Sequence, residues 1–326
     1  MNSKNSFMDI LKSPKSIIGI IISFGAIYWC FKDFNFSEVY LLMFQINYIY
    51  VLFASILLWG SVWIRGLRWK LFFPKNNSPT INSLYKAEMI GYFGNNVLPL
   101  RLGELLRSYI IGNEYSLSKS FVFGTIILER IMDFLCLGLF GLILVLFFPF
   151  ETNFYNYIIL TIMIIFLIVF ILFILVSRIN LNATKNNVMI ILKNFINGLS
   201  SIRKEVILYA IFLSLIIWLI YLFDVYLLQK AFNFNLNWLQ ILAILVISSI
   251  AISIPSAPGM IGTFHAAIKF TMADLFAYSI SQGNLFAILT HAYGFIILSC
   301  FGAFYFIKCH FNRDALKLVM QSNNDN

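Results

Sequence analysis

The residues best suited to chemistry lie close together in one apolar segment. Glu129, Arg130 and Asp133 interrupt a run that is otherwise hydrophobic. Glu129 and Asp133 are four residues apart and share a helical face, while Arg130 is spaced to pair with Asp133. Ionisable groups inside such a segment are costly and are candidates for function. We predict that they bind a substrate or an ion; a helix-packing ion pair is the alternative.

A second group of charges follows an interruption at Gly94-Asn-Asn and Pro99. Pro99 suits the first turn of a helix, and the free N–H groups of a helix start bind anions. Arg101, Glu104 and Arg107 follow on one helical stripe, and we predict that they contact a phosphate headgroup. The alternative, most plausible for Arg107, is that they extend to the membrane surface. The predicted headgroup site comprises Asn95, Asn96, Arg101, Glu104, Arg107, Glu129, Arg130 and Asp133.

A similar interruption occurs late in the chain, at Ile254-Pro-Ser-Ala-Pro-Gly259. The residues expected to break helices at the two interruptions are Pro99, Gly103, Pro255, Pro258, Gly259 and Gly262. Secondary site candidates are His265, His291 and Asp224, although a lone histidine in an apolar segment is more often a packing residue. The chain has no His-x3-His, Cys-x2-Cys or Walker-type loop, so we expect neither a metal site nor a cofactor.

These residues are embedded in a chain with the composition of a membrane protein. Of its 326 residues, 60% are hydrophobic and only 11% are charged, against about 25% charged in soluble domains. This composition excludes a soluble enzyme, a nucleic-acid-binding module and a disordered tail protein. We predict an all-α polytopic membrane protein without a nucleic-acid partner, despite the net charge of +9.

The apolar stretches predict the membrane topology. A span needs about 20 apolar residues, and six stretches approach or exceed that length: 16–31, 48–64, 120–148, 155–177, 206–229 and 285–307. Two interrupted stretches, 83–112 and 238–281, are predicted to be re-entrant hairpins, because irregular backbone at membrane depth must be enclosed by protein or a wet cavity. Val188–Leu199 is amphipathic and predicts an interfacial helix. Gly138 and Gly141 predict a close helix-packing face.

The basic residues predict an orientation. With a cytoplasmic N-terminus and six crossings, most of the 23 Lys and Arg fall on the cytoplasmic side. Arg65 and Arg68, with Trp63 and Trp69, are expected to mark a membrane interface. We predict one integral domain over 1–326 in the cell membrane, with halves 15–149 and 150–308, a cytoplasmic tail at 309–326 and both termini cytoplasmic.

The two predicted halves have opposite orientations, as in the inverted repeats of secondary transporters. The hairpin tips share a Pro-x3-Gly pattern, at Pro99 to Gly103 and at Pro258 to Gly262. Because the pattern is short, a chance match is the alternative to a repeat.

Taken together, these motifs resemble a known family. Gly94-Asn-Asn-Val-Leu-Pro-Leu-Arg-Leu-Gly-Glu-Leu-Leu-Arg107 is similar to the signature of the lysylphosphatidylglycerol synthase transmembrane-region family, also called flippase-like domain proteins. Glu129-Arg130-x-x-Asp133 follows at the family's spacing, and Ile254 to Gly262 resembles its second Pro-Gly motif. The resemblance extends over about 15–308. Met260 stands where the family often has glycine, and His265 where many members have a carboxylate, which leaves the second hairpin's substrate contacts open.

The resemblance implies a function in lipid translocation. The family includes the membrane half of the multiple peptide resistance factor, which moves aminoacylated phosphatidylglycerol between leaflets while a separate soluble domain makes it. We expect no soluble domain here, so the resemblance implies translocation rather than lysyl transfer. It assigns the site to Asn95, Asn96, Pro99, Arg101, Gly103, Glu104, Arg107, Glu129, Arg130 and Asp133.

We therefore expect a transporter rather than an enzyme: a translocase for a phospholipid or a polyprenyl-phosphate-linked headgroup, without its own ATP hydrolysis. One alternative is an integral-membrane transferase acting on a lipid phosphate, with Glu104 or Asp133 as base. Another is a non-catalytic subunit of an envelope-assembly complex. The protein partners consistent with these roles are envelope-biosynthesis enzymes and a second copy of the chain. Headgroup, direction, energy coupling and oligomeric state are left open.

Overall fold

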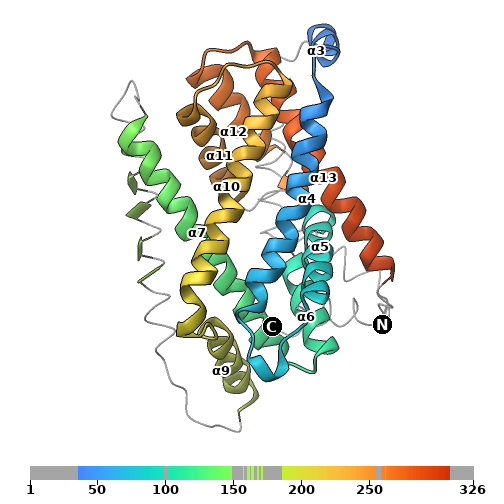
Figure 1. Cartoon of the computed structure of the whole chain (residues 1–326), viewed down its shortest axis with the longest axis vertical. Coiled ribbons are helices and arrows are strands. Elements are labelled where there is room, and N and C mark those ends of the chain that lie inside the picture. The colour runs from blue at the N-terminus through green and yellow to red at the C-terminus, as the bar shows by residue number, and fades with distance from the viewer. Residues whose placement is uncertain are drawn as a thin grey trace.

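The computed structural model describes residues 36–98, 102–148, 186–253, 258–260 and 262–308, together with scattered positions between 157 and 171. All regular elements within these residues are helical. They form an elongated bundle in which α4 (Tyr48–Lys70), α7 (Lys119–Phe147) and α10 (Ile207–Ala231) run along the long axis (Figure 1). The all-α prediction is confirmed for the described part of the chain.

Four predicted spans are confirmed as helices that are long and apolar enough to cross a membrane. The spans expected at 48–64, 120–148, 206–229 and 285–307 correspond to α4, α7, the segment Lys204–Ala231 that contains α10, and α13 (Ile280–Lys308). Each has 23 residues or more, which is sufficient for about 30 Å of hydrocarbon. The predicted span 16–31 lies outside the described residues, and only scattered positions of 155–177 are described.

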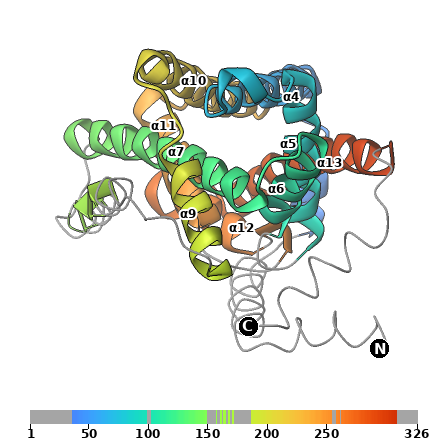
Figure 2. The same ribbon diagram turned by 90° about the horizontal axis from the view of Figure 1, so that it is seen from below.

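The long helices bury one face and expose another. α4 packs along α10, and Figure 2 shows the two side by side along one edge of the bundle. The exposed face of α4 carries Leu52, Phe53, Ile56 and Trp59. Large apolar side chains that point away from the bundle have no favourable place in water, so this surface is the one expected to face lipid.

The first interruption separates two helices that fold back on each other. α5 (Ile81–Val97) and α6 (Gly103–Glu114) pack together. Gly94 lies against Gly103, and Gly91 lies against Arg107, so the pair is antiparallel. The helices break where the sequence predicts. However, α6 begins at Gly103 rather than at Pro99, which lies outside the described residues.

Gly103 is required at this crossing because no side chain fits there. A Cβ at this position would overlap the carbonyl oxygen of Gly91 and lie 2.7 Å from Asn95 Oδ1. We expect Gly103→Ala to destabilise the protein by about 1–3 kcal/mol through overpacking, measured by denaturant titration in detergent micelles. Gly60→Ala on α4 is the matched control, because nothing lies within 4 Å of its Cβ position. Equal stability of the two variants would contradict the close approach.

The second interruption has a different local structure. α11 (Trp238–Ser253) is followed by the short turn η4 (Pro258–Met260), then by α12 (Thr263–Lys269) and a π-helical turn, η5 (Phe270–Leu275). Gly259 has φ 69°, and Gly262, which immediately precedes α12, has φ 99°. Glycine adopts both conformations without steric cost. Pro255 lies outside the described residues.

The two interrupted pairs occupy opposite ends of the bundle. Figure 1 shows α5 and α6 in the lower half and α11 and α12 in the upper half. In both pairs the glycine of the Pro-x3-Gly pattern stands at a helix start: Gly103 is the first residue of α6, and Gly262 precedes Thr263 of α12. Gly103 is needed for close approach and Gly262 for its backbone angle.

Helix α13 contacts both interruptions. The Asn96 amide at the end of α5 donates a hydrogen bond of 2.9 Å to Ser299 Oγ. A ring nitrogen of His291 lies 2.7 Å from the Gly259 carbonyl oxygen. The Cβ position of Gly259 is in turn 3.5 Å from the Asn96 carbonyl oxygen. The two interruptions therefore meet, and both are bound to the same helix.

The predicted helix at Val188–Leu199 is present as α9 (Asn187–Leu199). Ile196 and Leu199 are buried where α9 packs on α7, whereas Val188 and Ile191 are exposed. The two backbones approach closely at Gly124 and Gly198, since a Cβ added to Gly124 would lie 3.0 Å from Gly198 Cα. The packing face predicted at Gly138 and Gly141 is not filled by any described helix, since no described atom lies within 4 Å of either Cβ position.

Candidate functional site

The centre of the predicted site is the buried carboxylate of Glu129 on α7. Its side chain has no exposed surface, and it accepts hydrogen bonds from Arg65 Nη2 and, at 2.9 Å, from Arg107 Nη2. The guanidinium groups of Arg68 and Arg130 each lie 3.6 Å away. One carboxylate thus joins four arginines, two from α4, one from α6 and one from α7 itself. It can stay ionised because charged donors replace water.

Asp133, one turn further along α7, extends the cluster toward α10. It accepts hydrogen bonds from Arg65 at 3.0 Å and from Arg68 at 2.8 Å. Arg68 also donates to Ser214 Oγ on α10 at 2.8 Å. Glu129 and Asp133 therefore share a helical face and the same arginine partner, as their four-residue spacing predicts.

Glu88 on α5 completes the buried part of the cluster. It accepts a hydrogen bond of 2.5 Å from Arg107 and lies 3.8 Å from Arg65. The Arg107 guanidinium also stacks over the Trp69 ring, 4.2 Å from its centroid, and Trp69 donates to Thr125 at 2.9 Å. Arg107 is buried by these contacts, so the alternative in which it reaches the membrane surface is wrong.

Arg130 lies at the edge of the cluster. Its Nε is 3.2 Å from Glu104 Oε1, and Nη1 is 3.6 Å from Asp133. Its side chain is 27% exposed, against 3% or less for the other arginines of the cluster. Four guanidinium groups face four carboxylates; we call this set the charge cluster: Arg65, Arg68, Glu88, Glu104, Arg107, Glu129, Arg130 and Asp133.

Three members of the charge cluster were missed by sequence reasoning. Arg65 and Arg68 were expected at a membrane interface, but both are buried against α7 carboxylates. Glu88 was not singled out. The signal that could have found all three is charge balance, because a charge buried inside the protein requires an opposite charge beside it. Trp63 is exposed, as an interfacial residue would be, whereas Trp69 is fully buried.

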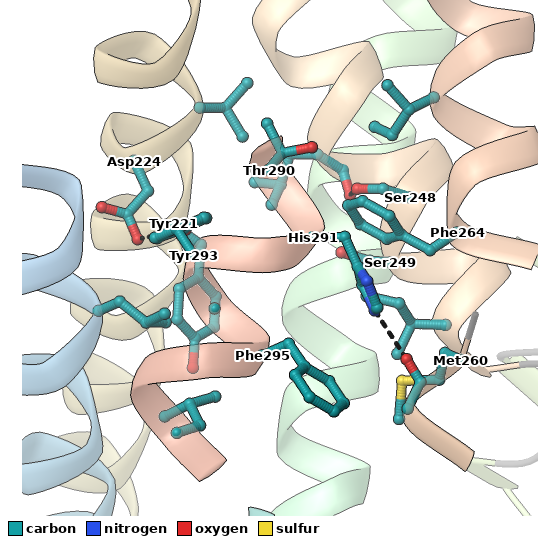
Figure 3. A pocket seen from close by; sticks show the side chains of 18 of the residues that line it. Tyr221, Asp224, Ser248, Ser249, Met260, Phe264, Thr290, His291, Tyr293 and Phe295 are labelled. Atoms are coloured by element: carbon teal, nitrogen blue, oxygen red, sulfur yellow. Dashed lines mark hydrogen bonds between the residues drawn. The ribbon is translucent and has the colours of Figure 1, made fainter. Parts of the chain in front are cut away.

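A cavity of about 340 Å³ lies between the two interruptions and the long helices. We call it the central cavity. Glu104 and Arg130 of the charge cluster line it, so only the accessible edge of the cluster faces this space. The other walls are mainly apolar and come largely from α10, α11, α12 and α13, including Leu245. Phe264 and Phe295 are among the apolar residues that Figure 3 shows at this space. Such a space suits a ligand with a small charged group and an apolar body.

The two asparagines have separate roles. Asn95 Oδ1 accepts a hydrogen bond of 3.0 Å from the Gly103 N–H and so caps the start of α6. Asn96 binds Ser299, as described above. Both also line the central cavity. Two further predicted members, Pro99 and Arg101, lie outside the described residues, as does Pro255 of the second interruption.

The secondary candidates lie in the second half of the chain. His291 faces the central cavity and contacts the Gly259 carbonyl (Figure 3). The His265 ring is buried beside it, with centroids 4.8 Å apart. Asp224 lines the opposite wall, where Tyr293 donates to its Oδ2 at 3.3 Å. His291 and Asp224 therefore line the central cavity. His265 is not among the lining residues and packs against the His291 ring instead.

Met260, in the second interruption, has a strained backbone conformation. Its φ is 57°, directly after Gly259 at 69°. A residue with a Cβ pays about 1–2 kcal/mol for this left-handed conformation. We expect Met260→Gly to be about 1 kcal/mol more stable than Met260→Ala, because both lose the thioether and only glycine relieves the strain. Denaturant titration of the two variants measures the difference; equal midpoints would contradict a strained Met260.

The fold and the site together define a class: helical integral membrane proteins with a buried charge cluster beside a central, largely apolar cavity. Within that class the chain belongs to the family described as "Lysylphosphatidylglycerol synthase TM region", whose sequence profile matches residues 16–302. The predicted resemblance is confirmed.

Two archaeal relatives have been matched. The UPF0104 membrane protein MJ1078 of Methanocaldococcus jannaschii is 26% identical over 202 residues, which cover 60% of this chain and 85% of the relative. The UPF0104 membrane protein MJ1595 of the same organism is 28% identical over 126 residues, or 38% of each chain. No solved structure matches the sequence.

Proposed function

We propose that this protein is a lipid translocase that moves a phospholipid or a lipid-linked headgroup across the cytoplasmic membrane without hydrolysing ATP itself. The observation that carries the proposal is the position of Arg130. It is the most exposed arginine of the charge cluster, and it lines the central cavity. A guanidinium group is suited to bind a phosphate oxygen pair. The apolar walls are suited to the first part of an acyl chain.

The charge cluster favours binding over acid–base chemistry. Asp133 accepts hydrogen bonds from two arginines, at 2.8 and 3.0 Å, and Glu104 lies 3.2 Å from Arg130. Both carboxylates are thus engaged by guanidinium groups, an arrangement that suits them to orient those cations. This argues against the transferase alternative, in which one of these two residues would act as base.

The two interruptions supply a basis for alternating access. We propose that α5–α6 and α11–α12 are re-entrant hairpins that enter the membrane from opposite sides, and that the candidate spans at 16–31 and 155–177 complete six crossings. The positions of the two pairs at opposite ends of the bundle and the glycines at both helix starts support an inverted repeat. Cytoplasmic termini follow from six crossings and the distribution of basic residues.

Leaflet exchange in proteoliposomes tests the proposal. Purified protein is reconstituted into liposomes containing fluorescent phosphatidylglycerol, and a membrane-impermeant quencher reports the label that remains in the inner leaflet. We expect faster loss of protected label than in protein-free liposomes and in liposomes containing the Arg130→Ala variant. Lipid probes with other phosphate headgroups, assayed in the same way, define the substrate class.

Two outcomes would count against the proposal. Exchange equal to that of protein-free liposomes for every phosphate probe, from protein shown to be folded, would reject translocation. A new covalent lipid product would instead support the transferase. Mass spectrometry of the extracted lipids, from the same vesicles, distinguishes the two.

A further inference from the structure

A second polar site lies in the central cavity, away from the charge cluster. Asp224 is on α10, three residues beyond Tyr221, which contacts Arg65 at 3.5 Å. Arg68 binds Ser214, ten residues before Asp224, which is a displacement of about 15 Å along the helix. Asp224 is therefore about three turns from the Arg68 contact and one turn beyond the Arg65 contact, and no guanidinium group of the charge cluster forms an ion pair with it among the described residues. It is 3% exposed, and it lines the cavity wall shared by α10 and α13 (Figure 3).

The surroundings of Asp224 do not balance a negative charge. Oδ2 receives one hydrogen bond, from Tyr293 at 3.3 Å, and Oδ1 has no hydrogen-bond partner among the described residues. No described cation forms an ion pair with it. A carboxylate buried in this way requires either a counter-charge or a proton.

The other titratable groups around Asp224 are few. Tyr221 on its own helix and Tyr293 on α13 flank it, and His291 of α13 and Tyr92 of α5 line the same cavity. From α4, Arg65 reaches only as far as Tyr221. From α7 and α6, Arg130 and Glu104 line the cavity and are paired with each other. Helix α11 has no titratable side chain.

We propose that Asp224 is a proton-binding site of the central cavity. Oδ1 takes up one proton when the site is open to one side of the membrane and releases it to the other, while Tyr293 holds the carboxyl group through Oδ2. A Na⁺ ion is less suited, because a hard cation needs several oxygen ligands, and one carboxylate beside one tyrosine hydroxyl does not supply them.

The site also gives the translocase an energy source, an inference that rests on the proposed function. If Arg130 holds the lipid phosphate in the cavity that Asp224 also faces, the lipid and the proton bind in the same cavity. That cavity would open alternately to the two sides of the membrane. One proton exchanged or carried per lipid would then drive net movement. A pH difference of one unit would shift the leaflet ratio of the lipid by up to about tenfold.

Infrared difference spectroscopy tests the proton site without any transport. Spectra of the reconstituted full chain are recorded at two pH values, for wild type, Asp224→Asn and the matched control Asp274→Asn, whose carboxylate is exposed. We expect a carboxyl C=O band that changes with pH in wild type and Asp274→Asn and is absent in Asp224→Asn. Tyr293→Phe should shift the band, because it removes the hydrogen bond to Oδ2. Identical spectra for all variants would overturn the proton site.

A pH gradient tests the coupling. Vesicles containing fluorescent phosphatidylglycerol, with the membrane potential clamped by K⁺ and valinomycin, are given a one-unit pH difference. We expect wild type and Asp274→Asn to redistribute the label toward one leaflet by up to about tenfold, and Asp224→Asn to give no redistribution.

Each outcome bears on a different claim. If wild-type protein exchanges lipid but the leaflet distribution does not change with the pH gradient, or changes with a Na⁺ gradient instead, proton coupling is overturned. The proposal of translocation is unaffected by that result. Loss of response in Asp224→Asn only with amine-bearing probes would show a headgroup contact instead and overturn the proposal. If wild type exchanges no lipid, translocation itself fails, and the infrared spectra still decide whether Asp224 binds a proton.

Discussion

Replacing Glu129 with alanine is expected to destabilise the folded protein by about 3–5 kcal/mol, the usual cost of removing one member of a buried ion pair. The reason is the asymmetry of the charge cluster. Glu129 accepts hydrogen bonds from Arg65 and Arg107, and two further guanidinium groups lie within 3.6 Å. Without it, four buried or half-buried cations face three carboxylates.

Denaturant titration in detergent micelles measures this effect, with the elution profile as a second indicator of folding. Glu205→Ala is the matched control, because Glu205 is exposed and should change stability by less than about 0.5 kcal/mol. The double variant Arg65→Met/Glu129→Met removes one charge of each sign. It should be less destabilised than the sum of its single variants, because no charge is left without a partner. Additive effects would contradict a coupled cluster.

Replacing Arg130 with alanine is expected to reduce leaflet exchange by about 10- to 100-fold, the equivalent of losing a charge-assisted contact of roughly 1.5–3 kcal/mol. The fold should tolerate the change. The Arg130 side chain is 27% exposed and its partner Glu104 is 15% exposed, so we expect a smaller loss of stability than the roughly 3–5 kcal/mol of breaking a fully buried pair. Loss of activity with retained stability separates Arg130 from the buried arginines.

Two further variants sharpen that result. Arg130→Lys keeps the charge and loses the planar fork, so we expect intermediate exchange if phosphate is bound through two oxygens. Lys204→Ala removes an exposed cation outside the cavity and should leave exchange unchanged. Exchange by Arg130→Ala at the wild-type rate would remove Arg130 from the mechanism.

The sequence alone predicted the helical architecture and much of the charge cluster. The confirmed spans are long and continuously apolar, which is the strongest signal that a sequence offers. The interruptions were also predicted, because Pro and Gly break helices through known effects on the backbone. Glu129 and Asp133 were correctly placed on one face because a four-residue spacing fixes their direction within a helix.

The sequence could not predict which helix those carboxylates face. Arg65 and Arg68 stand near the basic end of α4, where cations at a membrane surface are common, so their pattern favoured an interface. They are buried because α4 packs beside α7 and α10, which brings Asp133 and Ser214 within hydrogen-bond distance. Glu88 is a single carboxylate in an apolar stretch, and only the antiparallel packing of α5 on α6 brings it to Arg107.

The Gly138 and Gly141 prediction is not tested by the described residues. Their spacing is typical of helix crossings, yet among the described helices the close glycine contact on α7 is at Gly124, against Gly198. A glycine spacing indicates only that a second helix could approach closely there without a steric clash. Which allowed position is used depends on the partner helix, and that information lies elsewhere in the chain.

The charge cluster also imposes an order on biogenesis. During synthesis α4 emerges before α7, so Arg65 and Arg68 enter the membrane more than fifty residues before Glu129 and Asp133 exist. Both arginines lie in the last two turns of α4, so each costs less during insertion than the roughly 2.5–3.5 kcal/mol of an unpaired arginine at the centre of a span. Helix α4 therefore becomes fully stable in the bilayer only after α7 arrives beside it. Membrane integration and tertiary folding are in this way coupled for the first half of the chain.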